Sequence, residues 1–196
     1  MPKIVDHDVR REQVLEATIR VVARSGLDGA TMRSIAEEAG CSTGLVTHHF
    51  ANRDDVIVGV LRHVHRRSAR RMDRHVHRRP AFDALAAVVA EALPLDDERR
   101  MEWSVWLAFW GAAVGDAALE AEHRQRYAEW RALVRQLLQR GVDDGSVRPD
   151  LDVRLEADRL VALVDGLGIQ ATLEPDRLKP RRVTALVKRH LSDLSA

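Results

Sequence analysis

Cysteine is nearly absent from this sequence of 196 residues, in which Cys41 is the only one. An internal disulfide and the cysteine-rich zinc sites are therefore excluded. Long apolar runs are missing too, because none approaches the roughly 18 to 20 residues that would span a bilayer. The first eleven residues are polar and lack the apolar segment of a secretory signal. These absences lead us to expect a cytoplasmic protein with no membrane partner.

Sequence motifs of common hydrolases are also missing. The chain contains no H-E-x-x-H, no G-x-S-x-G and no glycine-rich phosphate loop. Histidines occur among arginines in residues 62–79, RHVHRRSARRMDRHVHRR, as the pairs His63/His65 and His75/His77. Residues two apart point about 200° from each other around a helix, so neither pair can chelate one metal. We expect no enzyme, no metal site and no cofactor, and interpret this stretch as a solvated cationic helix face.

Charge is unevenly distributed, although the net charge is only +1. Residues 1–79 carry 15 lysines and arginines against 10 acidic residues, a net charge of +5. Residues 80–196 carry 16 against 20, a net charge of −4. The basic part is a candidate for binding phosphate backbones, and the acidic part is expected to meet a different partner.

Apolar residues recur at helical spacing nearly everywhere, and stretches that alternate at period two are absent. We therefore predict an all-α fold with an N-terminal helix-turn-helix module over 1–53, a connecting helix over about 53–79 and a ligand-binding and dimerisation domain over 80–196. Glycines and prolines mark most of the breaks between helices. The nine predicted helices cover about 8–25, 31–39 with Thr31 as the cap, 43–49, 53–79, 81–93, 97–114, 116–140, 153–174 and 181–194.

The segment from Thr31 to Arg53, TMRSIAEEAGCSTGLVTHHFANR, carries the strongest functional signal. Two short helices joined by a tight connection that contains glycine form the helix-turn-helix pattern. Ser42 is placed to cap the second helix, so the first residues of that helix can approach base edges in a major groove. The outward positions of this helix are Thr43, Gly44, Leu45, Thr47 and His48.

The run AGCSTGLVTHHFANRDDV, preceded by T-x-R-x-I-A, resembles the signature of the tetracycline-repressor-like (TetR) family of transcriptional regulators. The resemblance implies that Arg33 contacts a base, and that four residues face the groove: Thr43, Gly44, Leu45 and His48. It further implies four contacts to the DNA backbone: Thr31, Thr47, His49 and Arg53. Thr47 departs from the family, which usually has tyrosine there, so the aromatic contact is lost.

Aromatic residues make up only 4% of the chain, yet four tryptophans lie close together in sequence. Trp103, Trp106 and Trp110 are spaced i, i+3 and i+7, and so share one helix face. Tyr127 and Trp130 share a face of the next helix. These side chains either form core or line a cavity that is apolar or accepts a cation against the rings. Nearby acidic residues that could complete a cationic site are Glu102, Asp116, Glu120 and Asp165.

A second resemblance covers MEWSVWLAFWGAAVGDAALEAEHRQRY and LVALVDGLGIQATL. These runs are similar to the C-terminal domain of the choline-responsive repressors of betaine synthesis (BetI-type). The resemblance implies a cavity between these helices. The predicted ligand-binding residues are Trp103, Trp106, Trp110, Tyr127, Trp130 and Asp165, and the expected inducer is a cationic or amphipathic small molecule.

The last two helices carry apolar stripes that either form a dimer interface or complete the core of one subunit. Gly166 and Gly168 are expected to permit close approach of helices. The resemblance implies a four-helix interface between two subunits. The predicted interface residues are Leu160, Leu163, Val164, Leu167, Ala171, Val183, Leu186 and Val187.

Together these patterns predict a ligand-responsive transcriptional regulator. We expect a repressor that binds a pseudo-palindromic double-stranded DNA operator as a homodimer and is released by a small-molecule inducer. The alternative is a dimeric small-molecule-binding protein whose DNA-binding module is vestigial.

Overall fold

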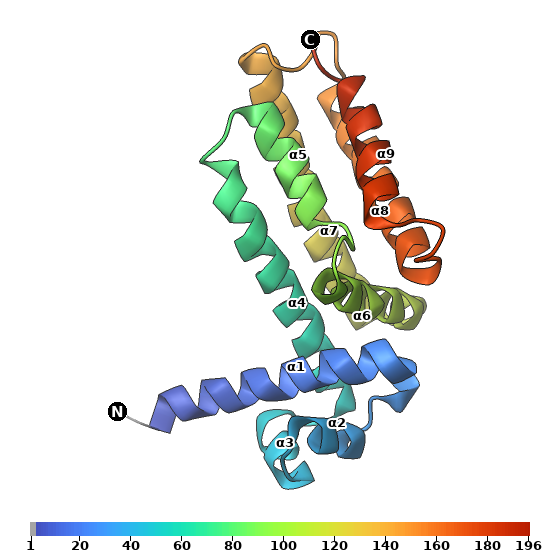
Figure 1. Ribbon diagram of the computed structural model, residues 1–196. Coiled ribbons are helices and arrows are strands. Elements are labelled where there is room, and N and C mark those ends of the chain that lie inside the picture. Colours follow the sequence, from blue (N-terminus) through green and yellow to red (C-terminus); the bar gives the residue numbers. More distant parts are fainter. Residues whose placement is uncertain (1–2) are drawn as a thin grey trace. The chain divides into compact units, whose positions relative to one another are not determined.

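The structure, a computed structural model, describes the backbone of residues 3–196 and the side chains from His7 onward. The described chain is all-α, as predicted (Figure 1). One isolated antiparallel bridge joins Val147 to Ser195. The helices are α1 (Lys3–Gly29), α2 (Met32–Ala39), α3 (Thr43–His49), α4 (Arg53–Val76), α5 (Ala81–Glu91), α6 (Asp97–Ala113), α7 (Ala117–Asp143), α8 (Val153–Leu173) and α9 (Pro180–Ser192).

Local capping chemistry determines where the short helices begin and end. The Thr31 hydroxyl accepts a hydrogen bond from the Ser34 N–H, and Ser34 completes a capping box by accepting from the Thr31 N–H. Gly40 ends α2 in the left-handed region at φ 65°, which a residue with a Cβ rarely adopts. Gly26 has a positive φ of 66° and a ψ of −175°, which is not helical, so the first helix breaks there as predicted. A further helical turn beyond this kink ends at Gly29.

Contacts between helices divide the chain into two compact units. The first contains the residues up to Arg66 together with 104–120, and the second contains 67–103 together with 121–196. Helices α4 and α6, and the first turn of α7, thus contribute residues to both units. The domain boundaries near residues 53 and 80 are therefore still a prediction from the sequence.

The first unit is built around the three N-terminal helices. Leu15 and Ile19 of α1, Ile35 of α2 and Val46 of α3 are all at most 3% exposed and form the core of this unit together with Phe50. A further buried cluster in the same unit consists of Leu61, Phe109 and Ala113, with Trp106, Trp110 and Leu119 packed against it.

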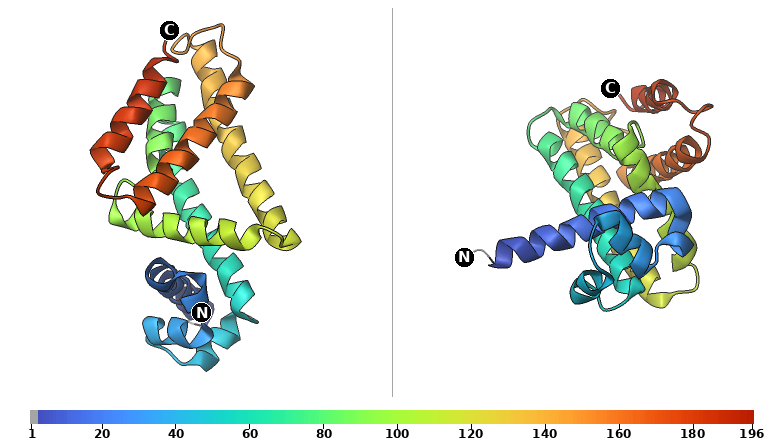
Figure 2. Two further views of the ribbon diagram at one scale, coloured as in Figure 1. Left: turned by 90° about the vertical axis from the view of Figure 1, so that its right-hand side faces the viewer. Right: turned by 60° about the horizontal axis from the view of Figure 1, so that its bottom comes forward.

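The second unit packs α5, α7, α8 and α9 around a continuous apolar core. In Figure 2, α8 and α9 lie side by side and are joined by the loop that follows Leu173. Core side chains with no exposed surface are Leu85, Val88, Leu137, Leu138, Leu160 and Val183. In the described part of the chain, no helix combines the length and the apolar character needed to cross a membrane.

The expectation of a solvated cationic face over residues 62–79 is wrong for several side chains. His63 is 5% exposed, and its Nε2 lies 2.8 Å from a Glu16 carboxylate oxygen. Arg71 donates to both carboxylate oxygens of Glu102, at 2.9 and 2.5 Å, and to Glu91 at 3.2 Å. The acidic partners are distant in sequence, so the periodicity of α4 alone could not reveal them.

Candidate functional site

Helix α3 presents the predicted groove-facing residues on an accessible surface. The Ser42 hydroxyl accepts a hydrogen bond from the Leu45 N–H at 3.2 Å and so caps the helix, as expected. Thr43, Gly44 and His48 are exposed, whereas Leu45 is half-buried. Because the adjacent Val46 is fully buried, the helix is fixed with its polar side outward. This arrangement is the one that a recognition helix requires.

Arg33 on α2, a predicted base contact, is largely exposed to solvent. Its side chain is 85% exposed, and its Nε donates to Glu37 at 2.9 Å one turn further along the helix. A surface ion pair of this kind contributes little to stability and breaks readily. The guanidinium is therefore accessible to a ligand.

Three of the four predicted backbone contacts have structural partners within the protein. Arg53 donates from Nε to the Ala30 carbonyl at 3.0 Å and from Nη2 to the Leu27 carbonyl, which ties α4 to the end of α1. The Thr31 hydroxyl caps α2, and the Thr47 hydroxyl donates to the Gly44 carbonyl at 3.1 Å. These bonds support the module itself, so substitutions at these positions would change its stability as well as any contact to DNA.

The structure brings together three histidines, one of which the sequence analysis did not single out. His7 of α1 lies against His48 and His49 of α3, with ring centroids 5.7 and 4.3 Å away. The His48 and His49 centroids are 5.3 Å apart. No sequence spacing could pair His7 with residues more than forty positions later.

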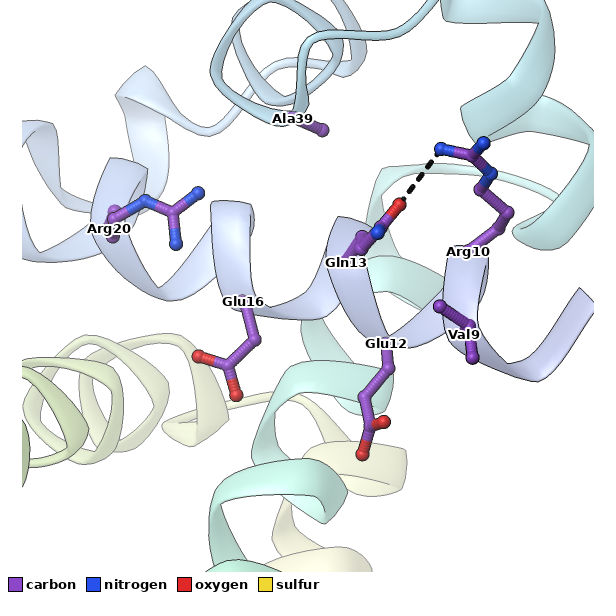
Figure 3. Close-up of a pocket in the computed structure, with 7 residues that line it drawn as sticks. All are labelled: Val9, Arg10, Glu12, Gln13, Glu16, Arg20 and Ala39. Carbon is purple, nitrogen blue, oxygen red and sulfur yellow. Dashed lines mark hydrogen bonds between the residues drawn. The ribbon is translucent and has the colours of Figure 1, made fainter. Parts of the chain in front are cut away.

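A shallow hollow of about 600 Å³ runs along α1 (Figure 3). Arg10 and Gln13 extend from α1, and Arg10 donates a hydrogen bond of 3.1 Å to the Gln13 side-chain oxygen. Ala39 of α2 lies across the hollow from them. The lining is open and largely charged, unlike the apolar, enclosed sites that bind small organic molecules. The residues around it are Val9, Arg10, Glu12, Gln13, Glu16, Arg20 and Ala39.

Tyr127 of α7 and Asp165 of α8 form the most unusual polar pair of the second unit. The Tyr127 hydroxyl donates to Asp165 at 2.9 Å, and the tyrosine ring lies 4.3 Å from the His123 ring. Burial raises the pKa of Asp165 to about 6, while Tyr127 and then Arg131 act in the opposite direction. Burial and the adjacent Asp165 raise the pKa of Tyr127 as well. In the described part of the chain, Asp165 forms no ion pair.

The tryptophans of α6 do not share one environment. Trp103 is 7% exposed, its Nε1 donates to the Ala92 carbonyl at 2.9 Å, and its ring packs against Gly168. Trp106 and Trp110 lie in the other unit, half-buried, with ring centroids 6.2 Å apart. Trp130 on α7 is half-buried.

The structure places most of the predicted interface stripe inside one subunit. Only Leu186, at 41% exposed, and the half-buried Leu163 remain accessible. The close approach at Gly168 is to the Trp103 ring of α6, within the same subunit. The six buried members of the stripe are Leu160, Val164, Leu167, Ala171, Val183 and Val187.

Comparison with known proteins identifies the family. Residues 14–60 match the tetR family of bacterial regulatory proteins, and residues 81–196 match the C-terminal domain of BetI-type transcriptional repressors. The chain belongs to the TetR family. Its members are non-enzymatic helix-turn-helix regulators that bind operator DNA, many of them ligand-responsive repressors, and the resemblance drawn from the sequence is confirmed.

Relatives of this TetR-family chain match over nearly its whole length. The HTH-type transcriptional regulator PksA of Bacillus subtilis is 32% identical, covering 99% of this chain and 94% of its own. The HTH-type transcriptional regulator BetI of Burkholderia ambifaria is 30% identical, covering 100% and 99%. Among solved structures, a transcriptional regulator from Saccharomonospora viridis in complex with choline is 29% identical, with a TM-score of 0.83 and 93% of both chains covered.

Proposed function

We propose that this TetR-family regulator is a repressor that binds a pseudo-palindromic operator as a homodimer and leaves it when a cationic small molecule binds. The ligand class is inferred from the half-buried Asp165 carboxylate, whose hydrogen-bond partner is an aromatic hydroxyl and on which Arg131 acts only through its longer-range charge. The exposed, capped α3 argues against a vestigial DNA-binding module, since the surface that would read bases is intact.

The DNA contacts that the structure supports best are the exposed ones. Arg33 is suited to a bidentate contact with guanine, the commonest specific contact in the major groove. Thr43, Gly44 and His48 are accessible on the outer side of α3. Thr31, Leu45, Thr47, His49 and Arg53 remain predicted contacts.

The chemistry around Asp165 supports a cation as the inducer. A half-buried carboxylate loses part of its hydration, so an organic cation that reaches it provides a favourable partner for its charge. The Tyr127 ring lies beside it and contacts the His123 ring, and aromatic faces attract quaternary ammonium groups. Arg131 already lies over the Tyr127 ring at 5.3 Å, which shows that this ring accepts a cation. The solved relative holds choline, a quaternary amine. Trp103, Trp106, Trp110 and Trp130 remain predicted ligand contacts, with Trp103 the most deeply packed.

Choline is expected to release the protein from DNA of its own upstream region. Asp165→Asn should weaken choline binding about tenfold or more, equivalent to about 1.4 kcal/mol, because the compensating charge is removed. Since only the carboxylate form attracts the cation, choline affinity should fall as the pH drops below about 6, where Asp165 becomes protonated. Fluorescence anisotropy of labelled operator measures release from DNA. Tryptophan emission measures the affinity for choline.

The neutral isostere 3,3-dimethylbutanol and an anionic compound of similar size serve as ligand controls. Arg33→Ala should weaken operator binding by about 1–3 kcal/mol and leave choline binding unchanged. Release by anions alone, or an unchanged choline response in Asp165→Asn, would contradict the cationic-inducer proposal.

The exposed side of α8 supports the dimer. Leu155 and Leu173 are 58% and 68% exposed, unusually high values for large apolar side chains on one helix. Between them lie Ala162 and Gly166, and a Cβ built on Gly166 has no atom within 4 Å. Leu186 on the adjacent α9 extends this surface. Small residues between larger apolar ones allow two helices to pack closely, so we take this surface as the dimer contact.

Gly166→Leu is expected to produce a folded monomer that no longer binds the operator. The new side chain meets open space within its own subunit and improves helix propensity, so only association with a second subunit should suffer. Two recognition helices about 34–36 Å apart are needed to reach successive major grooves, and a monomer has only one. Sedimentation at micromolar concentration and operator binding give the readouts.

Leu186→Glu should also produce a monomer, whereas Ala132→Glu, at an exposed position of α7, should leave the dimer intact. A wild-type protein that sediments as a stable monomer, or a dimeric Gly166→Leu variant, would refute this interface.

A further inference from the structure

His7, His48 and His49 form a histidine cluster at the end of the recognition helix. The three ring centroids lie 4.3 to 5.7 Å from one another, with the ring planes inclined by 63° to 75°. His7 and His48 are exposed, and His49 is half-buried. The cluster therefore joins α1 and α3 through titratable rings on an accessible surface.

The surroundings of the cluster are cationic. Burial, and then His7, His48 and Arg11, lower the pKa of His49. Arg11 lies over the Phe50 ring at 4.8 Å, beside the end of α3. The Asp8 carboxylate lies 4.0 Å from Nδ1 of His7 and is 81% exposed. The Nδ1 atom of His49 is buried, and in the described part of the chain it has no hydrogen-bond partner.

We propose that a phosphate of the operator backbone lies against the histidine cluster and that DNA binding is coupled to proton uptake by these imidazoles. This inference rests on the proposed DNA-binding function. It adds His7 to the DNA-facing surface and makes operator affinity dependent on pH.

Electrostatics favours a phosphate over a metal ion at this position. Arg11 repels a divalent cation and attracts an anion. Among the described residues, no group of three or more histidine, cysteine or acidic side chains has a geometry that could hold a metal. A phosphate stabilises protonated imidazole, so it raises the imidazole pKa in the complex. Binding then takes up protons, and affinity rises as the pH falls.

Operator affinity is expected to increase up to about tenfold per pH unit for each proton taken up as the pH falls from 8 toward 5.5. His7→Gln and His48→Gln should each flatten this dependence by at least half, while His77→Gln, an exposed histidine in the turn after α4, should retain it. Anisotropy titrations of the full-length protein at constant ionic strength measure the slope. Circular dichroism establishes that each variant is folded.

A random-sequence duplex should show a similar pH slope at weaker affinity, because phosphates carry no sequence information. EDTA should have no effect. A wild-type slope retained in both His7→Gln and His48→Gln, or binding that requires zinc, overturns the inference. Absence of DNA binding at every pH would instead overturn the proposed function.

Discussion

Replacing Arg71 with methionine is expected to lower the free energy of unfolding by about 3 kcal/mol. Glu102 is 6% exposed at its side chain, and Arg71 engages both of its oxygens. Without this partner the carboxylate keeps the weaker contact to Arg67, whose Nε lies 3.4 Å away. Breaking one side of a buried ion pair leaves an uncompensated charge, which costs more than the intact pair contributes. The network also includes Glu91 and Glu98.

Urea unfolding followed by circular dichroism measures this loss. Arg70→Met, at the exposed neighbouring position, is the matched control and should change stability by less than about 0.5 kcal/mol. The double variant Arg71→Met/Glu102→Leu should recover most of the loss, because the buried carboxylate is removed together with its partner. Equal stability of the two single arginine variants would show that the network contributes nothing.

Gly168→Ala is expected to destabilise the protein by about 1–3 kcal/mol, even though alanine is the better helix former. The new Cβ would lie 2.0 Å from Cη2 and 2.1 Å from Cζ2 of Trp103, a separation that packed atoms do not tolerate. The indole cannot easily retreat, because its N–H is held by the Ala92 carbonyl. Overpacking therefore forces either α8 or the tryptophan to shift.

Gly111→Ala on α6 provides the control for this substitution, since a Cβ there meets nothing within 4 Å. It should be neutral or slightly stabilising in the same unfolding experiment. Trp103→Leu should remove part of the clash, so its effect and that of Gly168→Ala should be less than additive. Strictly additive changes in the free energy of unfolding would mean that residue 168 and Trp103 do not clash.

The helix-turn-helix could be predicted from the sequence because the residues that determine it act locally. Thr31 and Ser42 are capping residues directly before short apolar patterns, and Gly40 supplies a left-handed residue where the chain must turn. Each of these rules acts within four residues. The predicted helices therefore agree with the structure within a few residues at most ends.

Side-chain partners that are distant in sequence could not be predicted in the same way. Periodicity identified an apolar stripe on α8, but it could not show that this stripe is the subunit core while Leu155 and Leu173 point outward. The same applies to Arg53, whose carbonyl acceptors lie more than twenty residues earlier. In each case the residue type indicates which kind of contact the side chain makes. It does not indicate which residue is the partner in that contact.

The solitary Cys41 has a practical consequence. It lies half-buried in the turn between α2 and α3, where its N–H donates to the Ala36 carbonyl at 3.0 Å. Because no other thiol competes, a maleimide dye or nitroxide would attach at one position per subunit, directly before the recognition helix. A dimer would carry two such labels, one on each subunit. The separation between them, followed by energy transfer or pulsed electron resonance, would report the spacing of the two DNA-reading surfaces as an inducer is added.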